Sequence, residues 1–130
     1  MLPRWVRPFL TVCAVYDLAL GAIFLVAYRA VLPRFGVTLP EHPAYLQFGA
    51  AYVFSMGVGL WLAARAPERN RDLLVVSLLA KIAYVAIVFG YRIAGSMPGL
   101  WVPFAWCDTA MAVGIVATLT AIPRPRPAVT

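Results

Sequence analysis

Three ionisable residues lie deep inside long apolar stretches of the sequence, where an isolated charge is unfavourable. They are Asp17, Lys81 and Asp108, and Lys81 is the only lysine in the chain. A lone charge near the middle of a bilayer costs on the order of 3 kcal/mol or more, so such groups normally face a bundle interior and pair there. We therefore expect Lys81 to contact Asp17, Asp108 or both.

This Asp/Lys/Asp cluster supports two interpretations with equal force. Two carboxylates and one ammonium carry a net charge of −1 when all three are ionised. Ionisable groups at this depth are candidate functional sites, so the cluster is a candidate binding site for a proton or a ligand. Alternatively, the pairing is structural and fixes which helix faces which.

Four apolar stretches carry these residues and define the architecture. Hydrophobic residues make up 63% of the chain and charged residues 12%, whereas soluble domains have about half and about a quarter. The predicted spans are residues 9–31, 44–64, 73–93 and 100–121. Each is long enough to cross a hydrocarbon core, and helix is the only spanning form open to it. The predicted fold class is therefore an all-α, antiparallel four-helix membrane bundle.

Domain limits and orientation follow from the residues between the spans. Residues 1–122 are expected to form one transmembrane domain that begins with a retained helix, not a cleaved signal. Residues 123–130 are expected to form a cytoplasmic proline-rich tail, and Leu32-Pro33 is expected to end the first span. Seven arginines flank the spans on one side: Arg4, Arg7, Arg65, Arg69, Arg71, Arg124 and Arg126. Three flank them on the other, Arg29, Arg34 and Arg92, so both termini are predicted to be cytoplasmic.

Helical spacing predicts an inward face on each span. Small or polar residues recur every four positions on the first two spans, which allows close helix approach. The predicted inward residues are Cys13, Asp17 and Gly21; Gln47, Ala51, Ser55 and Gly59; Ser77, Lys81 and Tyr84; and Phe104, Asp108 and Ala112. We expect Gln47 and Tyr84 to join the ionic cluster in a polar core. Further aromatic residues are assigned to core lining (Tyr52, Trp106) or to belts at the membrane surfaces (Trp5, Tyr28, Tyr91, Trp101).

Several classes of site lack the residues that they need. The single histidine, His42, and the two cysteines, Cys13 and Cys107, have no metal-ligand spacing, so we predict no metal and no cofactor. By helical rise the cysteines differ in depth by more than ~10 Å, which is too far for a disulfide. The net charge of +6 comes from arginines beside apolar runs, which is typical of membrane flanks and not of a nucleic-acid-binding surface.

The sequence resembles the DoxX-like group of small four-helix bacterial membrane proteins. The resemblance lies in Tyr16-Asp17 followed by Gly21, Leu46-Gln47-Phe48-Gly49, the arginine-rich turn Pro67–Arg71, Lys81 with Tyr84, and Asp108. It covers most of the chain as a pattern of isolated positions. It implies an antiparallel bundle in the bacterial cytoplasmic membrane, and a bias of ten arginines to one lysine is typical of a GC-rich bacterial genome. Some relatives are associated with quinone-linked oxidation or with assembly of membrane proteins, and no catalytic residue is carried over.

Three functions remain open on the sequence alone. The favoured one is a non-catalytic accessory subunit or assembly factor of a larger membrane complex, because the chain has little extramembrane mass. The second is a binder of, or an isomerase-like or quinone-linked enzyme for, a lipid-soluble small molecule. In that case Asp17 and Asp108 act as acid and base beside Lys81. The third is a proton-coupled transporter, which needs a dimer because four helices make a narrow pore.

Overall fold

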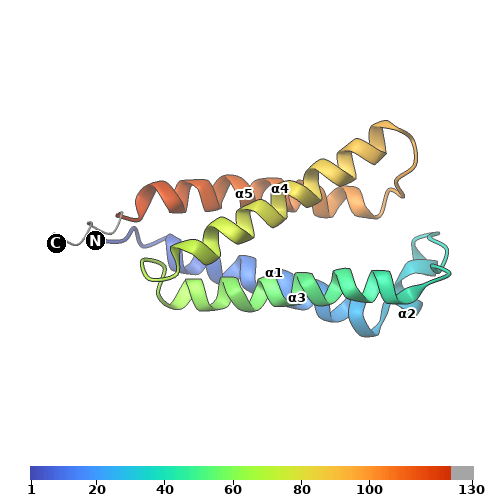
Figure 1. Ribbon diagram of the computed structural model, residues 1–130, viewed down its shortest axis with the longest axis horizontal. Helices are drawn as coiled ribbons and strands as arrows, with labels where there is room; N and C mark the ends of the chain where they lie inside the picture. The colour runs from blue at the N-terminus through green and yellow to red at the C-terminus, as the bar shows by residue number, and fades with distance from the viewer. Residues whose placement is uncertain (124–130) are drawn as a thin grey trace, which may run out of the picture.

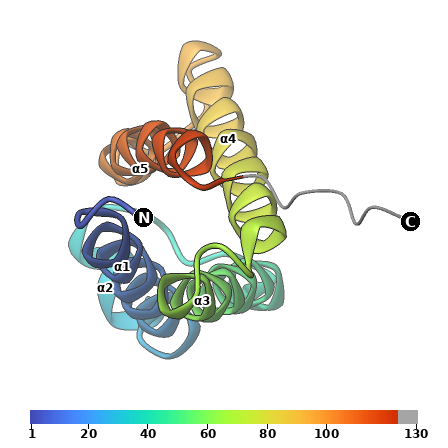
Figure 2. The same ribbon diagram turned by 90° about the vertical axis from the view of Figure 1, so that its left-hand side faces the viewer.

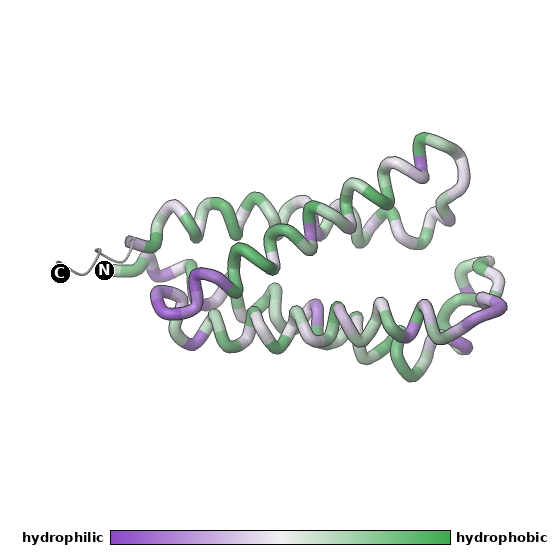
Figure 3. The backbone as a smooth tube through the Cα atoms, viewed as in Figure 1, coloured by the Kyte–Doolittle hydropathy of each residue, from purple (hydrophilic) through white to green (hydrophobic). Residues whose placement is uncertain are grey.

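The computed structural model describes residues 1–123, and most of this part of the chain is helical (Figure 1). The helices are α1 (Val6–Val26), α2 (Tyr28–Arg34), α3 (Pro43–Arg65), α4 (Arg71–Ile93) and α5 (Trp101–Ala121). All except α2 are long and apolar enough to cross a membrane, and the hydropathy-coloured tube shows their apolar character along their lengths (Figure 3). The predicted all-α four-helix membrane bundle is confirmed, and the chain is a multi-pass membrane protein.

The helices run up and down the bundle and form two hairpins. The first hairpin contains α1, α2 and α3, and the second contains α4 and α5. The N-terminus, the α3–α4 connection and the end of α5 lie at one end of the molecule (Figure 1). The predicted cytoplasmic location of that end stays a prediction. Of the proline-rich tail expected at 123–130, only Pro123 lies within the described residues.

The first predicted span is divided at Ala27, so the prediction that Leu32-Pro33 ends it is wrong. Ala27 leaves the helical region with φ −112° and ψ 9°, and its carbonyl accepts the N–H groups of Ala30 and Val31 as a new helix begins. Pro33 lies inside this short helix, α2, which ends within the next turn. No glycine or proline marks the division at Ala27, which is why the sequence pattern placed it too late.

Two glycines bring α1 and α3 into backbone contact. A Cβ atom on Gly21 of α1 would lie 2.6 Å from the backbone nitrogen of Phe54, and one on Gly57 of α3 would lie 2.7 Å from that of Leu18. Neither distance is compatible with a real side chain, so each helix needs a glycine where the other approaches. This contact confirms that Gly21 faces inward, and it makes the first hairpin the tighter of the two pairs.

The inward face of α3 differs from the predicted one. Ser55 is exposed and donates to the carbonyl of Ala51 in its own helix, and a Cβ on Gly59 would meet only one Leu73 methyl, at 4.0 Å. The residues that face inward instead are Leu46, Ala50, Val53, Gly57, Leu60 and Ala64. Their alternating spacing of three and four follows a helix of 3.6 residues per turn, whereas a strict four-residue repeat drifts around it.

The two hairpins pack closely at one end, and toward the other end α1 and α5 stay in contact through Phe24 and Trp101 while α3 and α4 separate. At the end with the N-terminus, which we call the closed end, a core forms from Val6, Leu10, Cys13, Ala14, Leu60, Ala63, Ala64, Leu74, Ile115 and Ile122. From there α4 diverges from α3 as it runs toward the α4–α5 connection (Figures 1 and 2). We call the end around Phe24, Tyr84 and Trp101 the open end. The ionic cluster lies between these two regions.

Candidate functional site

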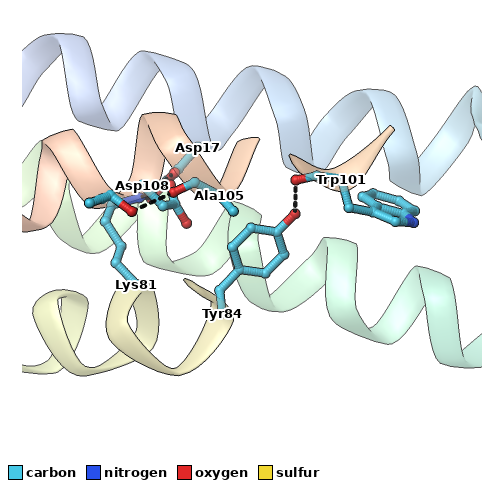
Figure 4. A network of polar contacts seen from close by, with 7 residues as sticks. Asp17, Lys81, Tyr84, Trp101, Ala105 and Asp108 are labelled. Carbon is cyan, nitrogen blue, oxygen red and sulfur yellow. Dashed lines mark hydrogen bonds and ion pairs between the residues drawn. The ribbon is translucent and has the colours of Figure 1, made fainter. Parts of the chain in front are cut away.

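The lysine of α4 joins carboxylates from two other helices, as the sequence predicts. Lys81 Nζ donates to both oxygens of Asp17 on α1, at 3.0 and 3.2 Å. It also donates to Oδ1 of Asp108 on α5, at 2.9 Å. The ammonium therefore lies between the two carboxylates (Figure 4). The bond to Asp17 links the two hairpins, and the bond to Asp108 lies within the second.

The two carboxylates differ in access. The side chains of Lys81 and Asp17 are each 5% exposed, whereas that of Asp108 is 13% exposed. Asp17 has both oxygens engaged by Lys81, while Oδ2 of Asp108 has no hydrogen-bond partner among residues 1–123. Of the two acids, Asp108 is thus the one able to meet another molecule.

A cavity of about 740 Å³ lies beside this ionic cluster. Its wall is built mostly from apolar side chains of all four long helices, and the three members of the cluster form part of it. Its volume falls within the range of roughly 300–1,000 Å³ that is usual for small-molecule sites. An apolar chamber with a few convergent polar groups is the arrangement expected of a ligand site.

The mouth of the cavity faces sideways, between α3 and α4. Tyr45 and Tyr52 of α3 and Ile87 of α4 line it and are each at least half exposed. This is where the two helices diverge (Figure 2). In a bilayer these helix sides face acyl chains, so a lipid-soluble molecule would enter the cavity from the membrane and not from water.

Aromatic residues close the cavity toward the end of the bundle. The ring of Trp101 lies 5.1 Å from that of Phe24 and 6.4 Å from that of Phe104, measured between centroids. Tyr84 donates its hydroxyl to the carbonyl of Trp101 at 3.4 Å, which ties α4 to the start of α5 (Figure 4). Trp101 therefore lines the cavity, and its assignment to an aromatic belt missed this role.

The predicted polar core is only partly assembled. Tyr84 lines the cavity with Asp17, Lys81 and Asp108. Gln47 does not contact the cluster, because it lies near the start of α3 and donates Nε2 to the Leu25 carbonyl at 3.1 Å. It thereby satisfies a carbonyl near the end of α1, where the division at Ala27 interrupts the helical ladder.

Of the other two aromatic residues predicted to line the core, one lines the cavity and the other does not. Tyr52 lines the cavity, whereas Trp106 is largely exposed on the outside of α5, with its ring 5.1 Å from that of Phe89. The pattern on α5 explains the difference, since Trp101, Phe104 and Asp108 share one helix face and Trp106 lies off it. Trp101 lies about two helical turns before Asp108 on the same face. This spacing is the signal that could have placed Trp101 in the site.

Two further residues of the cavity wall, both on α3, were not predicted from the sequence. Gly49 and Met56 on α3 line the cavity, and a Cβ added to Gly49 would meet nothing within 4 Å. Both lie next to positions of the true inward face of α3, which the sequence pattern misplaced. A correct register for α3 would have identified them.

A buried phenol, that of Tyr16, lies near the ammonium. The hydroxyl oxygen of Tyr16 is buried and has no hydrogen-bond partner among residues 1–123. The centre of its ring lies 5.9 Å from Lys81 Nζ, close enough for a cation–π contribution to the cluster.

The two thiols form no disulfide, since Cys13 is buried, Cys107 is exposed and both are free. Within residues 1–123 no three histidine, cysteine or acidic side chains gather closely enough to hold a metal ion. The site therefore offers hydrogen bonding, charge and an apolar chamber.

No family model, no curated protein sequence and no solved structure matches the chain.

Proposed function

We propose that this protein binds a lipid-soluble small molecule in the cavity between its two hairpins. The observation that carries the proposal is the cavity of about 740 Å³, whose largely apolar wall includes the Lys81 ammonium and the Asp108 carboxylate. The apolar part matches a hydrocarbon body, and the ionic cluster matches one polar group at its end.

The cavity changes the preference among the functions that the sequence leaves open. An accessory subunit needs an external surface for its partner, and it gives no role to an internal chamber. Exposed apolar side chains on the outside of the helices are expected in any bilayer-spanning protein, so they do not favour a protein partner. The lipophilic binder is therefore the leading proposal, and the accessory subunit is the alternative.

Acid–base catalysis by both aspartates receives less support than binding. Asp17 has both oxygens occupied by Lys81 and is nearly inaccessible. Only Asp108 has an oxygen available to a substrate. An isomerase with two carboxylates in complementary roles would need a second accessible acid, as would a proton relay through Asp17 in a dimeric transporter.

The cellular setting belongs to the same proposal. The arginine distribution and the resemblance to DoxX-like proteins favour the bacterial cytoplasmic membrane with both termini inside. With that orientation, the mouth between α3 and α4 opens in the outer leaflet. A quinone-linked role stays a prediction that rests on the resemblance alone.

A glycine in the cavity wall provides the test. In Gly49→Leu, a side chain would enter the chamber without a clash at Cβ, because nothing lies within 4 Å of that position. Gly90→Leu is the matched control, since Gly90 is a helical glycine with equally open surroundings and does not line the cavity. The proteins would be extracted with native lipid and analysed by native mass spectrometry.

The wild type and Gly90→Leu should retain a bound small molecule, and Gly49→Leu should lose most of it. Equal retention by all three proteins would place the molecule elsewhere and contradict the proposal. No retained molecule, together with no thermal stabilisation by a total membrane lipid extract, would contradict it as well and leave the accessory role as the better account.

A further inference from the structure

We infer that the cavity selects a lipophilic molecule whose polar group donates a hydrogen bond, namely an alcohol or an amine, and that Asp108 receives this group. The inference rests on the proposed function and names its ligand class. It excludes lipophilic carboxylates and other anions, which share the same hydrocarbon body but present only acceptors.

The hydrogen bonds around Lys81 leave one carboxylate oxygen without a donor from residues 1–123. An ammonium has three N–H donors, and a carboxylate is acceptor-only. The Lys81 donors go to both oxygens of Asp17 and to Oδ1 of Asp108. Oδ2 of Asp108 is the one carboxylate oxygen of the cluster that no donor from residues 1–123 reaches. Its complement is an O–H or N–H group.

The accessible side of the cluster is the acceptor side. Asp108 lines the cavity and is the most exposed of the three ionic side chains. Tyr84, also in the wall, directs its proton to the Trp101 carbonyl, so its oxygen offers a lone pair to the chamber. Ser77 is the remaining polar side chain at this depth, and a hydroxyl can serve either role.

Charge favours the same class of ligand. Two carboxylates against one ammonium leave the ionised cluster with an excess negative charge, and its two carboxylates come from different helices. In the low dielectric of the bundle an added anion would be repelled strongly, whereas a cation or a neutral donor would not. The charge of the Lys81 ammonium is already counted in this balance, and its three N–H donors go to Asp17 and Asp108 and not to a ligand.

Three probes with the same chain separate the possible polar groups: dodecanol, dodecylamine and dodecanoate. Each would be added to the purified full chain in a nonionic detergent, and the change in melting temperature would be measured. Gly49→Leu serves as the reference that subtracts effects of the probe on the detergent micelle. The alcohol and the amine should raise the melting temperature of the wild type above this reference, and dodecanoate should not.

Asp108→Asn tests the acceptor directly. The Lys81 ammonium would hold the amide oxygen, so the amide NH₂ would face the cavity as a donor. We expect apparent affinity for dodecylamine to fall by about tenfold or more, because a charge-assisted bond is lost, and dodecanoate to gain. Asp17→Asn is the matched control: it removes the same charge but no free oxygen, so the alcohol should bind it as it binds the wild type.

The outcomes separate the two proposals. Stabilisation by the alcohol, the amine or both, with dodecanoate weaker, supports the inference and identifies the preferred donor. If dodecanoate stabilises the wild type as much as the other two probes do, the donor rule is overturned, while a lipophilic site stays in place. No difference from Gly49→Leu with any probe would overturn both proposals. The ranking of the three probes on the wild type decides the donor rule even where Asp108→Asn or Asp17→Asn fails to fold.

Discussion

The closed and open ends of this bundle are formed by the same four long helices, yet only the buried core of the closed end includes residues from all four. At the closed end, Leu10, Leu60, Leu74 and Ile115 are fully buried against one another. At the open end, small side chains such as Gly49 and Ala83 stand where α3 and α4 diverge, and a cavity remains between them. Helix number is therefore a poor guide to interior volume. The size of the facing side chains and the divergence of one helix decide it.

The ionic cluster occupies the boundary between these two regions. Asp17 follows Cys13 and Ala14 of the closed-end core by about one helical turn, and all three members of the cluster form part of the cavity wall. A structural and a binding role are thus compatible in this position. The Asp17–Lys81 bond holds the hairpins together, while Asp108 keeps an accessible oxygen.

The largest effect on stability is expected from breaking the ionic cluster. Lys81→Met would leave two buried carboxylates without their cation, and removing one partner of a buried ion pair typically costs about 3–5 kcal/mol. The free energy of unfolding, measured by denaturant titration in mixed micelles, should fall by that amount. Arg92→Met, at an exposed arginine near the end of α4, is the control and should change little. A loss below about 1 kcal/mol for Lys81→Met would show that the pairing contributes little to stability.

Leucine truncations on one helix would compare the two ends directly. Leu60→Ala removes a fully buried side chain at the closed end, and Leu46→Ala removes a half-buried one from the cavity wall, both on α3. We expect a loss of about 3 kcal/mol for the first, because it creates a new void, and about 1 kcal/mol for the second, because its surroundings are already open. Equal losses in the same titration would mean that the open end is packed as tightly as the closed one.

A pair of alanine substitutions would sharpen the account of the α1–α3 contact. Gly57→Ala would force a Cβ into the backbone of Leu18 and should destabilise the protein by about 2 kcal/mol. Gly59→Ala would meet only ordinary contact with Leu73 and should stabilise α3 by up to about 1 kcal/mol, because alanine favours helix. Opposite signs of the two changes in melting temperature are the expected result. A shared sign would contradict the inward face of α3 described above.

Much of this architecture could be predicted from residue type alone. Four apolar stretches separated by charged or proline-containing turns determine the spans, and a lysine at membrane depth requires carboxylates nearby, so the Lys81 contacts were foreseeable. The inward face of α3 was not, because its many small residues allow two overlapping stripes, and only the backbone contact at Gly57 distinguishes them. The cavity was beyond prediction for a related reason. It depends on how far α4 diverges from α3, which no local pattern records.

The bond between Lys81 and Asp17 also bears on how the chain enters its membrane. The second hairpin contains Lys81 and Asp108 and is electrically balanced at its centre, but the first carries Asp17 with no cation at that depth. During synthesis the first hairpin emerges earlier, so it holds an unmatched acid until α4 follows. A product that stops after α3 would keep an acid at membrane depth without its cation, which would distinguish an unfinished copy from a finished one.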